Sequence, residues 1–120
     1  MLRKFLRVKI KGARVTDTQL FYEGSITLDE EIVEKAGLLP GEEVLVLNLN
    51  NGARFTTYVI KGKKGSGVVC LNGPAARLGY PGDELIILCF AYLDEEEIKT
   101  HSTRFVTLNE ENRVVEVKDI

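Results

Sequence analysis

The chain has 120 residues, 44% of them hydrophobic and 28% charged, with a formal net charge of −2. These are ordinary globular values, so we expect a single domain over 1–120 and neither nucleic acid nor a membrane surface as a general partner. No apolar run approaches the roughly 20 residues that cross a bilayer. The N-terminus lacks the apolar stretch of a signal peptide, so a cytoplasmic protein is predicted.

The first strand is predicted where hydrophobic and basic residues alternate, with Leu6, Val8 and Ile10 on the apolar face. The first fourteen residues contain basic side chains and no acid: Arg3, Lys4, Arg7, Lys9, Lys11 and Arg14. Such a strand could bind nucleic acid, or its polar face could meet water and turn one cation towards an anionic ligand. We favour the second interpretation, because the rest of the chain is acidic and no ladder of aromatic residues accompanies the basic ones.

The segment Tyr22-Glu23-Gly24-Ser25 contains a pair of residues that could react with each other. Ser25 Oγ lies one residue past the Gly24 carbonyl and could attack it in a strained geometry. Gly24 lacks a Cβ and reaches backbone angles closed to other residues. The attack would turn the amide into an ester, elimination would cut the chain, and hydrolysis would leave a pyruvoyl ketone. Taken alone, a Gly-Ser pair is typical of a plain turn.

Turn residues and hydrophobic patterns divide the rest of the chain into short elements. Asp29 is placed to cap a helix and Gly37 to end it, while Asn51-Gly52 is a strong hairpin signal. We predict strands over 26–28, 44–49, 54–60, 68–71, 85–91, 105–108 and 114–117, helices over 30–36 and 72–76, and a solvated loop over 61–67. Asn72 is a candidate cap for the second helix, and the acidic run 94–97 is predicted to be a solvated helix start.

The two cysteines, Cys70 and Cys89, lie inside separate apolar runs and lack metal-ligand spacing. The single His101 offers them no obvious partner. We therefore predict two buried, reduced thiols and no metal site.

One supersecondary unit occurs twice. In both 37–44 and 78–85, a short helix leads through Pro-Gly-acid-Glu into a hydrophobic strand. Two copies predict a pseudo-twofold arrangement, and short strands with frequent turn signals predict a barrel. The fold expected from pattern alone is a small, mainly β barrel of two interleaved halves, with short helices.

The strand after the hairpin has polar residues on one face, because Arg54, Thr56 and Tyr58 alternate with Phe55 and Thr57. An arginine offers a fork of donors that fits a carboxylate. A tyrosine hydroxyl can transfer a proton, and a threonine hydroxyl can stabilise an oxyanion. Thr and Tyr are also favoured in strands for purely structural reasons.

Taken together, the motifs resemble the aspartate 1-decarboxylases, pyruvoyl-dependent enzymes that make β-alanine for pantothenate synthesis. The motifs with matching order and spacing are Lys9, Tyr22-Glu23-Gly24-Ser25, Asn51-Gly52, Arg54-Phe55, Thr57-Tyr58, Gly65-Ser66, Asn72-Gly73, Ala75-Ala76 and Gly82-Asp83. The resemblance covers roughly the first three quarters of the chain and fades beyond Tyr92.

This resemblance implies an all-β fold, the double-psi β-barrel, and a homotetramer with active sites at subunit interfaces. It implies that the precursor cuts itself between Gly24 and Ser25, which leaves a β chain of 1–24 and an α chain of 25–120. The α chain would begin with a pyruvoyl group at position 25, and L-aspartate would form a Schiff base with that group before it loses CO₂.

The resemblance also implies roles for individual residues. Thr57 would assist the cut and contact substrate, and Tyr58 would be the proton donor in decarboxylation. Arg54 and Lys9 would bind substrate carboxylates, although which cation holds which carboxylate stays open. The remaining substrate-binding positions form a loop that closes around the substrate, namely Asn72, Gly73 and Ala75.

Two non-catalytic functions are the alternatives. One is a small β-barrel that binds nucleic acid through its basic N-terminal strand, and the other is an adaptor domain. Both predict an uncut chain, whereas the enzyme predicts two fragments.

Overall fold

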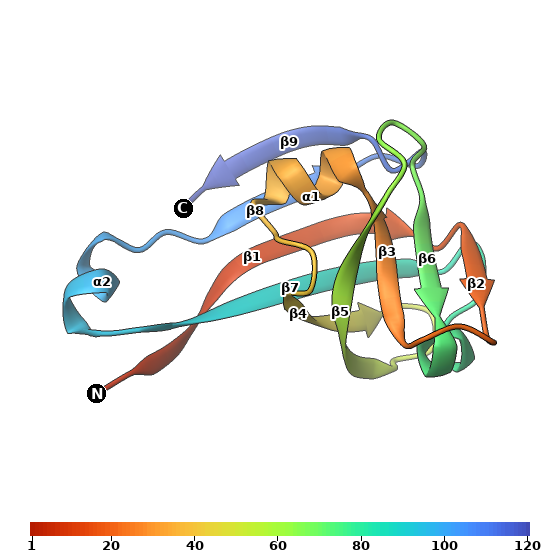
Figure 1. Ribbon diagram of the computed structural model, residues 1–120. Coiled ribbons are helices and arrows are strands. Elements are labelled where there is room, and N and C mark those ends of the chain that lie inside the picture. The colour runs from red at the N-terminus through yellow and green to blue at the C-terminus, as the bar shows by residue number, and fades with distance from the viewer.

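The computed structural model describes residues 1–120 as a nine-stranded sheet with short helices (Figure 1). The strands are β1 Arg3–Arg14, β2 Asp17–Gln19, β3 Ser25–Asp29, β4 Glu43–Asn48, β5 Arg54–Gly62, β6 Val69–Asn72, β7 Glu84–Leu93, β8 Arg104–Leu108 and β9 Val114–Asp119. Their order in the sheet is β2-β6-β3-β5-β4-β7-β1-β8-β9, with parallel pairs β2/β6, β3/β5 and β1/β8. The all-β prediction is confirmed, and the arrangement is the one expected of a double-psi β-barrel.

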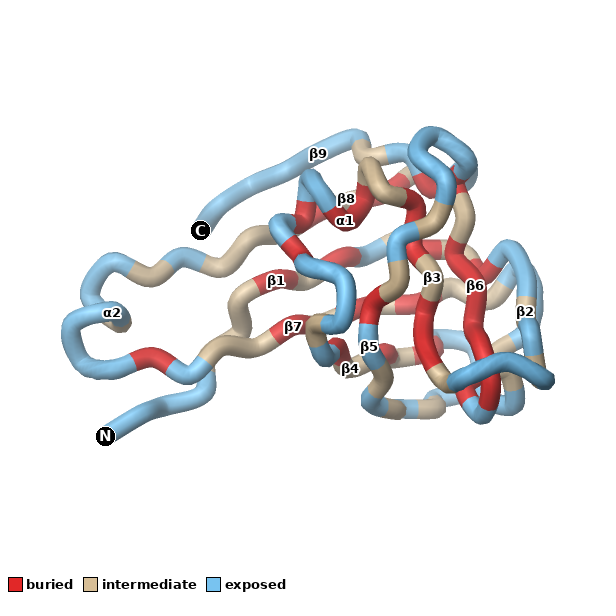
Figure 2. The backbone as a smooth tube through the Cα atoms, in the orientation of Figure 1, coloured by how far each residue is buried: buried red, intermediate tan, exposed pale blue.

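The core lies where the strands curl over one another, and its buried side chains come mainly from β1, β3–β8 and the helix α1, Glu30–Ala36 (Figure 2). Strand alternation decides which side chains enter it. In β4, Val44 and Val46 are buried, whereas Leu45 and Leu47 are only half-buried on the opposite face. The far ends of β1 and β7 leave the barrel as a two-stranded arm that leads towards α2 (Figure 1).

The predicted internal repeat is confirmed by matching hydrogen bonds at two corner turns. At the first corner, Gly41 N donates to Val59 O (2.8 Å) and Val59 N donates to Glu42 O (3.1 Å). At the second corner, Gly82 N donates to Val15 O (2.7 Å) and Val15 N donates to Asp83 O (2.9 Å). Both corner glycines have a left-handed φ, 87° and 94°, which explains why glycine follows each proline. The two Pro-Gly turns thus hydrogen-bond equivalent residues, Val59 and Val15, in the two halves of the barrel.

The local helix signals are confirmed. Helix α1 spans Glu30–Ala36, with Asp29 as its N-cap and Gly37, at φ 73°, as its C-cap. Helix α2 spans Glu95–Thr100 and begins with a capping box in which Asp94 and Glu97 exchange hydrogen bonds. Neither α-helix is long and apolar enough to cross a membrane.

Four details differ from the sequence predictions. Strand β1 is longer at both ends than the alternating stretch, and β2 was not predicted. The second predicted helix is a 3₁₀ helix, η1, over Gly73–Arg77. Asn72 precedes η1 but makes no capping hydrogen bond with its side chain. That prediction is wrong because the amide bonds residues of β3 instead.

The C-terminal hairpin of β8 and β9 is part of the same sheet as the other strands. Strand β8 pairs parallel with β1, and β9 pairs antiparallel with β8, as the predicted final hairpin requires. In the turn between them, Asn112 is buried with a left-handed φ of 60°. Its amide donates to Gly67 O (2.8 Å) and Arg14 O (2.9 Å), and its oxygen accepts from Arg14 N (2.8 Å).

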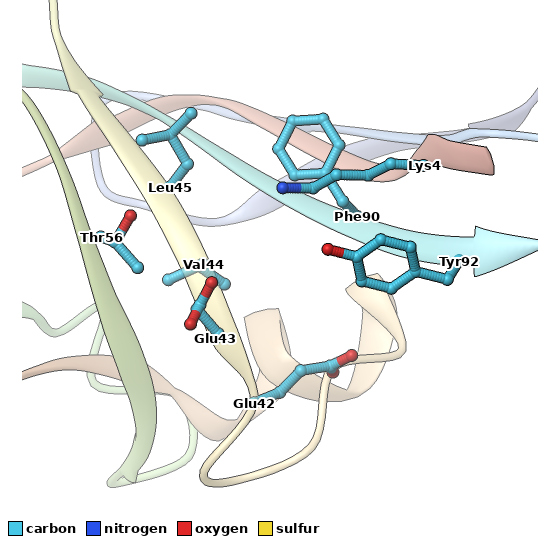
Figure 3. A pocket seen from close by; sticks show the side chains of 8 residues that line it. All are labelled: Lys4, Glu42, Glu43, Val44, Leu45, Thr56, Phe90 and Tyr92. Atoms are coloured by element: carbon cyan, nitrogen blue, oxygen red, sulfur yellow. The ribbon is translucent and has the colours of Figure 1, made fainter. Parts of the chain in front are cut away.

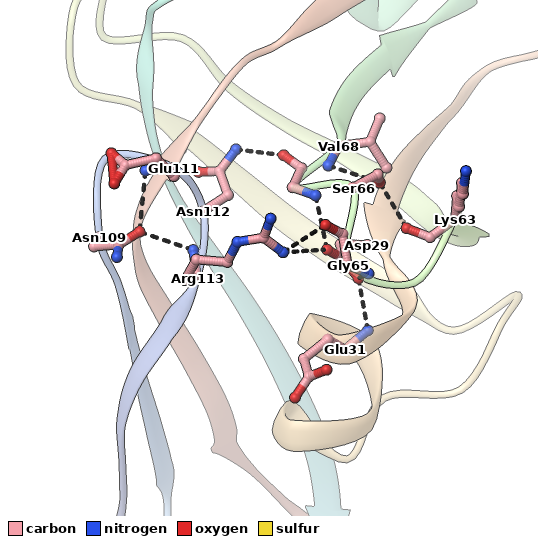
Figure 4. A network of polar contacts seen from close by, with 11 residues as sticks. Asp29, Glu31, Lys63, Gly65, Ser66, Val68, Asn109, Glu111, Asn112 and Arg113 are labelled. Carbon is pink, nitrogen blue, oxygen red and sulfur yellow. Dashed lines mark hydrogen bonds and ion pairs between the residues drawn. The ribbon is translucent and has the colours of Figure 1, made fainter.

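Asp29 joins the first turn of α1, the β5–β6 loop and the β8–β9 turn through one buried carboxylate (Figure 4). It accepts from the backbone N–H groups of Glu31 (2.8 Å), Gly65 (3.0 Å) and Gly67 (2.8 Å), and Arg113 lies 4.0 Å away. Burial by itself raises the pKa of this carboxyl, but the hydrogen bonds from Gly67, Glu31 and Gly65 and the charge of Arg113 outweigh it, so the pKa lies below its ordinary value. The ionised carboxylate therefore stabilises the fold.

Replacing Asp29 with alanine should remove the acceptor of three backbone N–H groups at once. We expect the free energy of unfolding to fall by about 3 kcal/mol, because each buried donor left without a partner costs roughly 1 kcal/mol or more. Urea denaturation at neutral pH measures the change. The matched control is Asp94→Ala, which removes an exposed cap and should cost about 1 kcal/mol. Equal losses in the two variants would contradict this account.

The stabilities of the wild type and of Asp29→Ala should respond differently to acid. Because the folded-state pKa of Asp29 lies below the unfolded value of about 3.9, its stabilisation is fully present above the unfolded value and is lost as pH falls through the folded one. Asp29→Ala should therefore lose less stability than the wild type between about pH 5 and about pH 2.

Candidate active site

Ser25 is the first residue of β3 and is completely buried. On one side, β3 pairs antiparallel with β6, so that Ser25 lies opposite Asn72. On the other side, β3 pairs parallel with β5, beginning at Ile26 opposite Val59. The Gly24–Ser25 bond therefore lies where β3 enters the sheet between two neighbouring strands.

The hydroxyl of Ser25 is hydrogen-bonded by a buried amide. Asn72 Nδ2 donates to Ser25 Oγ at 2.9 Å and to Thr27 Oγ1 at 2.9 Å. Asn72 Oδ1 accepts from Cys70 Sγ at 3.3 Å. Thr27 and Cys70 were not predicted as site residues. The available signal was the strand period of two, which puts Thr27 on the face of Ser25 and Cys70 on the face of Asn72.

A pocket of about 280 Å³ lies beside the Gly24–Ser25 bond. It is lined by Gly24, Phe55, Thr56, Thr57, Tyr58, Pro74, Ala75 and Leu78. Strand β5 contributes four consecutive residues because its edge is free of β3 before Val59. The parallel ladder begins with Ile26 opposite Val59, so Ser25 and Gly24 precede it on one side and Tyr58 and Thr57 precede it on the other. The structure thus brings together Gly24, Thr57, Tyr58 and Ala75.

Gly73, rather than Gly24, is the glycine that this site requires. Gly73 has a left-handed φ of 63°, and a Cβ there would lie 2.6 Å from Tyr22 O and 2.8 Å from Gly24 N. Gly24 itself is not among the glycines with positive φ, and a Cβ on it would meet only Pro74 Cδ at 3.5 Å. The expectation that Gly24 uses angles closed to other residues is therefore wrong for this conformation.

The two predicted carboxylate-binding cations lie outside this pocket. Arg54 and Lys9 make no ion pair within the chain, and Arg54 is exposed on β5. Lys9 lies in a row that crosses the sheet through Leu88 and Leu45 to Thr56. Three strand steps of about 4.8 Å put the Lys9 backbone roughly 14 Å from that of Thr56. Lys9 is therefore three strands away from β5 in the sheet and does not line the pocket.

A second hollow, of about 320 Å³, lies on the outer face of β4 and β7 (Figure 3). Lys4 extends beside two aromatic rings there, with its Nζ 4.9 Å from the centre of Phe90 and 6.0 Å from that of Tyr92. Thr56 is the only polar residue of β5 that lines this hollow. This hollow contains none of the predicted site residues.

The basic first strand is partly neutralised within the chain. Arg7 pairs with Glu42 at 2.7 Å, and Arg14 pairs with Glu84 at 3.3 Å. These contacts weaken the case for a basic surface that binds nucleic acid. Both cysteines are free and buried as predicted, and no group of three or more His, Cys, Asp or Glu side chains is arranged to hold a metal ion.

Comparison with known proteins gives consistent matches. The family model described as aspartate decarboxylase matches residues 1–115. The chain is 50% identical over 117 residues to the aspartate 1-decarboxylases of Staphylococcus aureus strains JH9 and Newman, which covers 98% of this chain and 92% of each relative. The expectation that similarity fades beyond Tyr92 is wrong, because the family match continues to residue 115.

Gly73→Ala should disturb the backbone next to Ser25. We expect it to lower the free energy of unfolding by about 3 kcal/mol, because a methyl group would meet main-chain atoms of residues 22–24 in addition to the strain of a left-handed φ. Gly52→Ala is the matched control, since Gly52 has φ 75° with open space around it, and it should cost only about 1 kcal/mol. Urea denaturation measures both, and equal costs would show that the close approach is unimportant.

Proposed function

The chain belongs to the aspartate decarboxylase family, and from that membership we propose that it converts L-aspartate to β-alanine and CO₂ with a pyruvoyl group made from its own Ser25. The observation that carries the proposal is the buried, hydrogen-bonded hydroxyl of Ser25 at a Gly-Ser bond beside a pocket. We further propose that the reaction takes place in the cytoplasm and supplies pantothenate biosynthesis.

Self-cleavage begins when Ser25 Oγ attacks the carbonyl carbon of Gly24. The Oγ proton passes to the Ser25 nitrogen as the C–N bond breaks, and an ester links the two residues. Loss of the Ser25 Cα proton then breaks the Cβ–Oγ bond and releases Gly24 as a carboxylate. The dehydroalanine left at position 25 takes up water and releases ammonia, which gives the ketone. The products are chains 1–24 and 25–120, divided within the single domain.

Thr57 is the proposed donor to the oxyanion that forms during the attack. Its position supports this role, because Thr57 and Gly24 line the same pocket. A donor held by a strand needs little rearrangement when charge develops on the carbonyl oxygen.

The residues around position 25 fit a pyruvoyl group, because the cut would remove Ser25 Oγ with Gly24 and leave the buried Nδ2 of Asn72, which donates to that oxygen in the uncut chain, available to the new ketone oxygen on Cα. Once formed, this group would supply a ketone that binds the substrate amine and withdraws electrons as CO₂ leaves. Tyr58 borders the same pocket and is partly exposed, which suits a hydroxyl that returns a proton to the substrate carbon. Gly73 and Ala75 would close against the bound substrate.

Arg54 and Lys9 are the proposed carboxylate ligands. Neither is paired with an acid of its own chain, so each is available to bind a substrate carboxylate. An arginine fork matches the retained carboxylate of aspartate and would favour it over monoacids. The assignment of each cation to one carboxylate stays open.

We propose a homotetramer whose sites lie between subunits. The outer sheet face that carries Lys9 also has half-buried apolar side chains on β4 and β7: Leu45, Leu47, Ile86, Leu88 and Phe90. Such a face is suited to cover by a second copy. A second copy could bring its Lys9 to this pocket, which the Lys9 of the same chain does not line.

Ser25→Ala should give a folded chain that stays whole and inactive, because no hydroxyl is left to attack Gly24. Intact mass spectrometry after warming measures the cut, and thermal unfolding checks the fold. The control is Ser66→Ala, which changes the exposed second Gly-Ser pair, Gly65-Ser66. It should be cut between Gly24 and Ser25 at the wild-type rate. Fragments of 1–24 and 25–120 from Ser25→Ala would refute the assigned nucleophile.

Arg54→Ala should still be cut but should lose aspartate turnover by about a hundredfold, the effect of one charge-assisted pair of hydrogen bonds. Turnover is measured as β-alanine released by material already shown to be fully cut. Arg77→Ala, which removes an exposed arginine from η1, is the charge-matched control and should keep its activity. Normal turnover in Arg54→Ala would remove this residue from the site.

A further inference from the structure

Four side chains on one face of the β3–β6 ladder form a polar cluster. The register pairs Ser25 with Asn72 and Thr27 with Cys70. Asn72 is at the centre, since its Nδ2 donates to both hydroxyls at 2.9 Å and its Oδ1 accepts from Cys70 Sγ at 3.3 Å. Both N–H bonds and the oxygen of this amide are therefore used.

The hydroxyls alone do not decide which way round the amide lies. A hydroxyl both donates and accepts, so Ser25 and Thr27 could bond either an amide NH₂ or an amide oxygen. A thiol is a weak donor and a weak acceptor, and in this cluster the Cys70 S–H is the donor, to Asn72 Oδ1 at 3.3 Å. Burial, with the nearby charge of Asp17, raises the pKa of the Cys70 thiol, so the sulfur keeps its proton at neutral pH. Cys70 is the neighbour that distinguishes the two ends of the amide.

We propose that Cys70 is a positioning residue for self-cleavage, which holds the Asn72 amide with Nδ2 towards Ser25 Oγ. In this orientation, Ser25 accepts a hydrogen bond and its own proton is free to move to the peptide nitrogen during the attack. In the reverse orientation, Ser25 would donate that proton to an amide oxygen, which is too weak a base to remove it. The inference rests on the proposed function, because it concerns the rate of the same cut.

The test compares cleavage rates of freshly purified precursors by intact mass, with thermal unfolding as the check on folding. Cys70→Ala removes the donor, and we expect it to slow the cut roughly five- to tenfold, the ratio set by one hydrogen bond. Cys70→Ser keeps a donor and should recover most of the rate. The control is Cys89→Ala, which removes a buried thiol that lies instead beside Arg7 and the carbonyl of Glu43. It should be cut at the wild-type rate.

Each result either supports or overturns the proposed role of Cys70. A folded Cys70→Ala chain cut at the wild-type rate overturns the proposal, and so does a Cys70→Ser chain cut as slowly as Cys70→Ala, since packing would then explain both. If Cys70→Ala does not unfold cooperatively, Cys70→Val replaces it, because valine fills the volume without a donor and carries the same expectation. A wild-type chain that stays whole would instead overturn the proposed function, and this inference with it.

Discussion

The burial of one hydroxyl determines how the candidate site is built. A hydroxyl removed from water needs a hydrogen-bond partner, and Ser25 has one in Asn72 only because β3 and β6 set these residues opposite each other. A slip of β3 by one residue would turn the Ser25 side chain to the other face, away from Asn72. The slip is prevented by the next pair, Ile26 and Leu71, which are fully buried in the core. The burial of this hydrophobic pair therefore fixes the register that places the Ser25 hydroxyl beside the Asn72 amide.

The two corner turns fix this register from outside the site. The first corner holds Val59, which pairs with Ile26 of β3 next to Ser25. The second corner holds Val15, and the following residue, Thr16, bonds the backbone of Val69 in β6. Each half of the pseudo-twofold barrel thus anchors one of the two strands that meet at the site. The two repeated turns therefore help to align β3 with β6.

The sequence predicted well what depends on neighbouring residues. Helix α1 and its caps follow from Asp29 and Gly37. What it could not predict depends on pairing between distant segments. Cys70 became a site residue only through the β3–β6 register, and β2 exists only because it pairs with β6. The cap prediction for Asn72 failed because a buried tertiary hydrogen bond was available to its amide.

The distribution of charge on β1 gives an argument for a site shared between chains. Arg7 and Arg14 are paired with acids of their own chain, whereas Lys9 is not and lies on the outer face beside Leu88. That face is too apolar to favour full exposure, and Lys9 lies on it three strands away from Thr56 of β5. A cation in this setting stabilises an anion best when another surface covers it and excludes water. In the proposed tetramer, cover of the apolar face and delivery of Lys9 to a neighbouring pocket would follow from one contact.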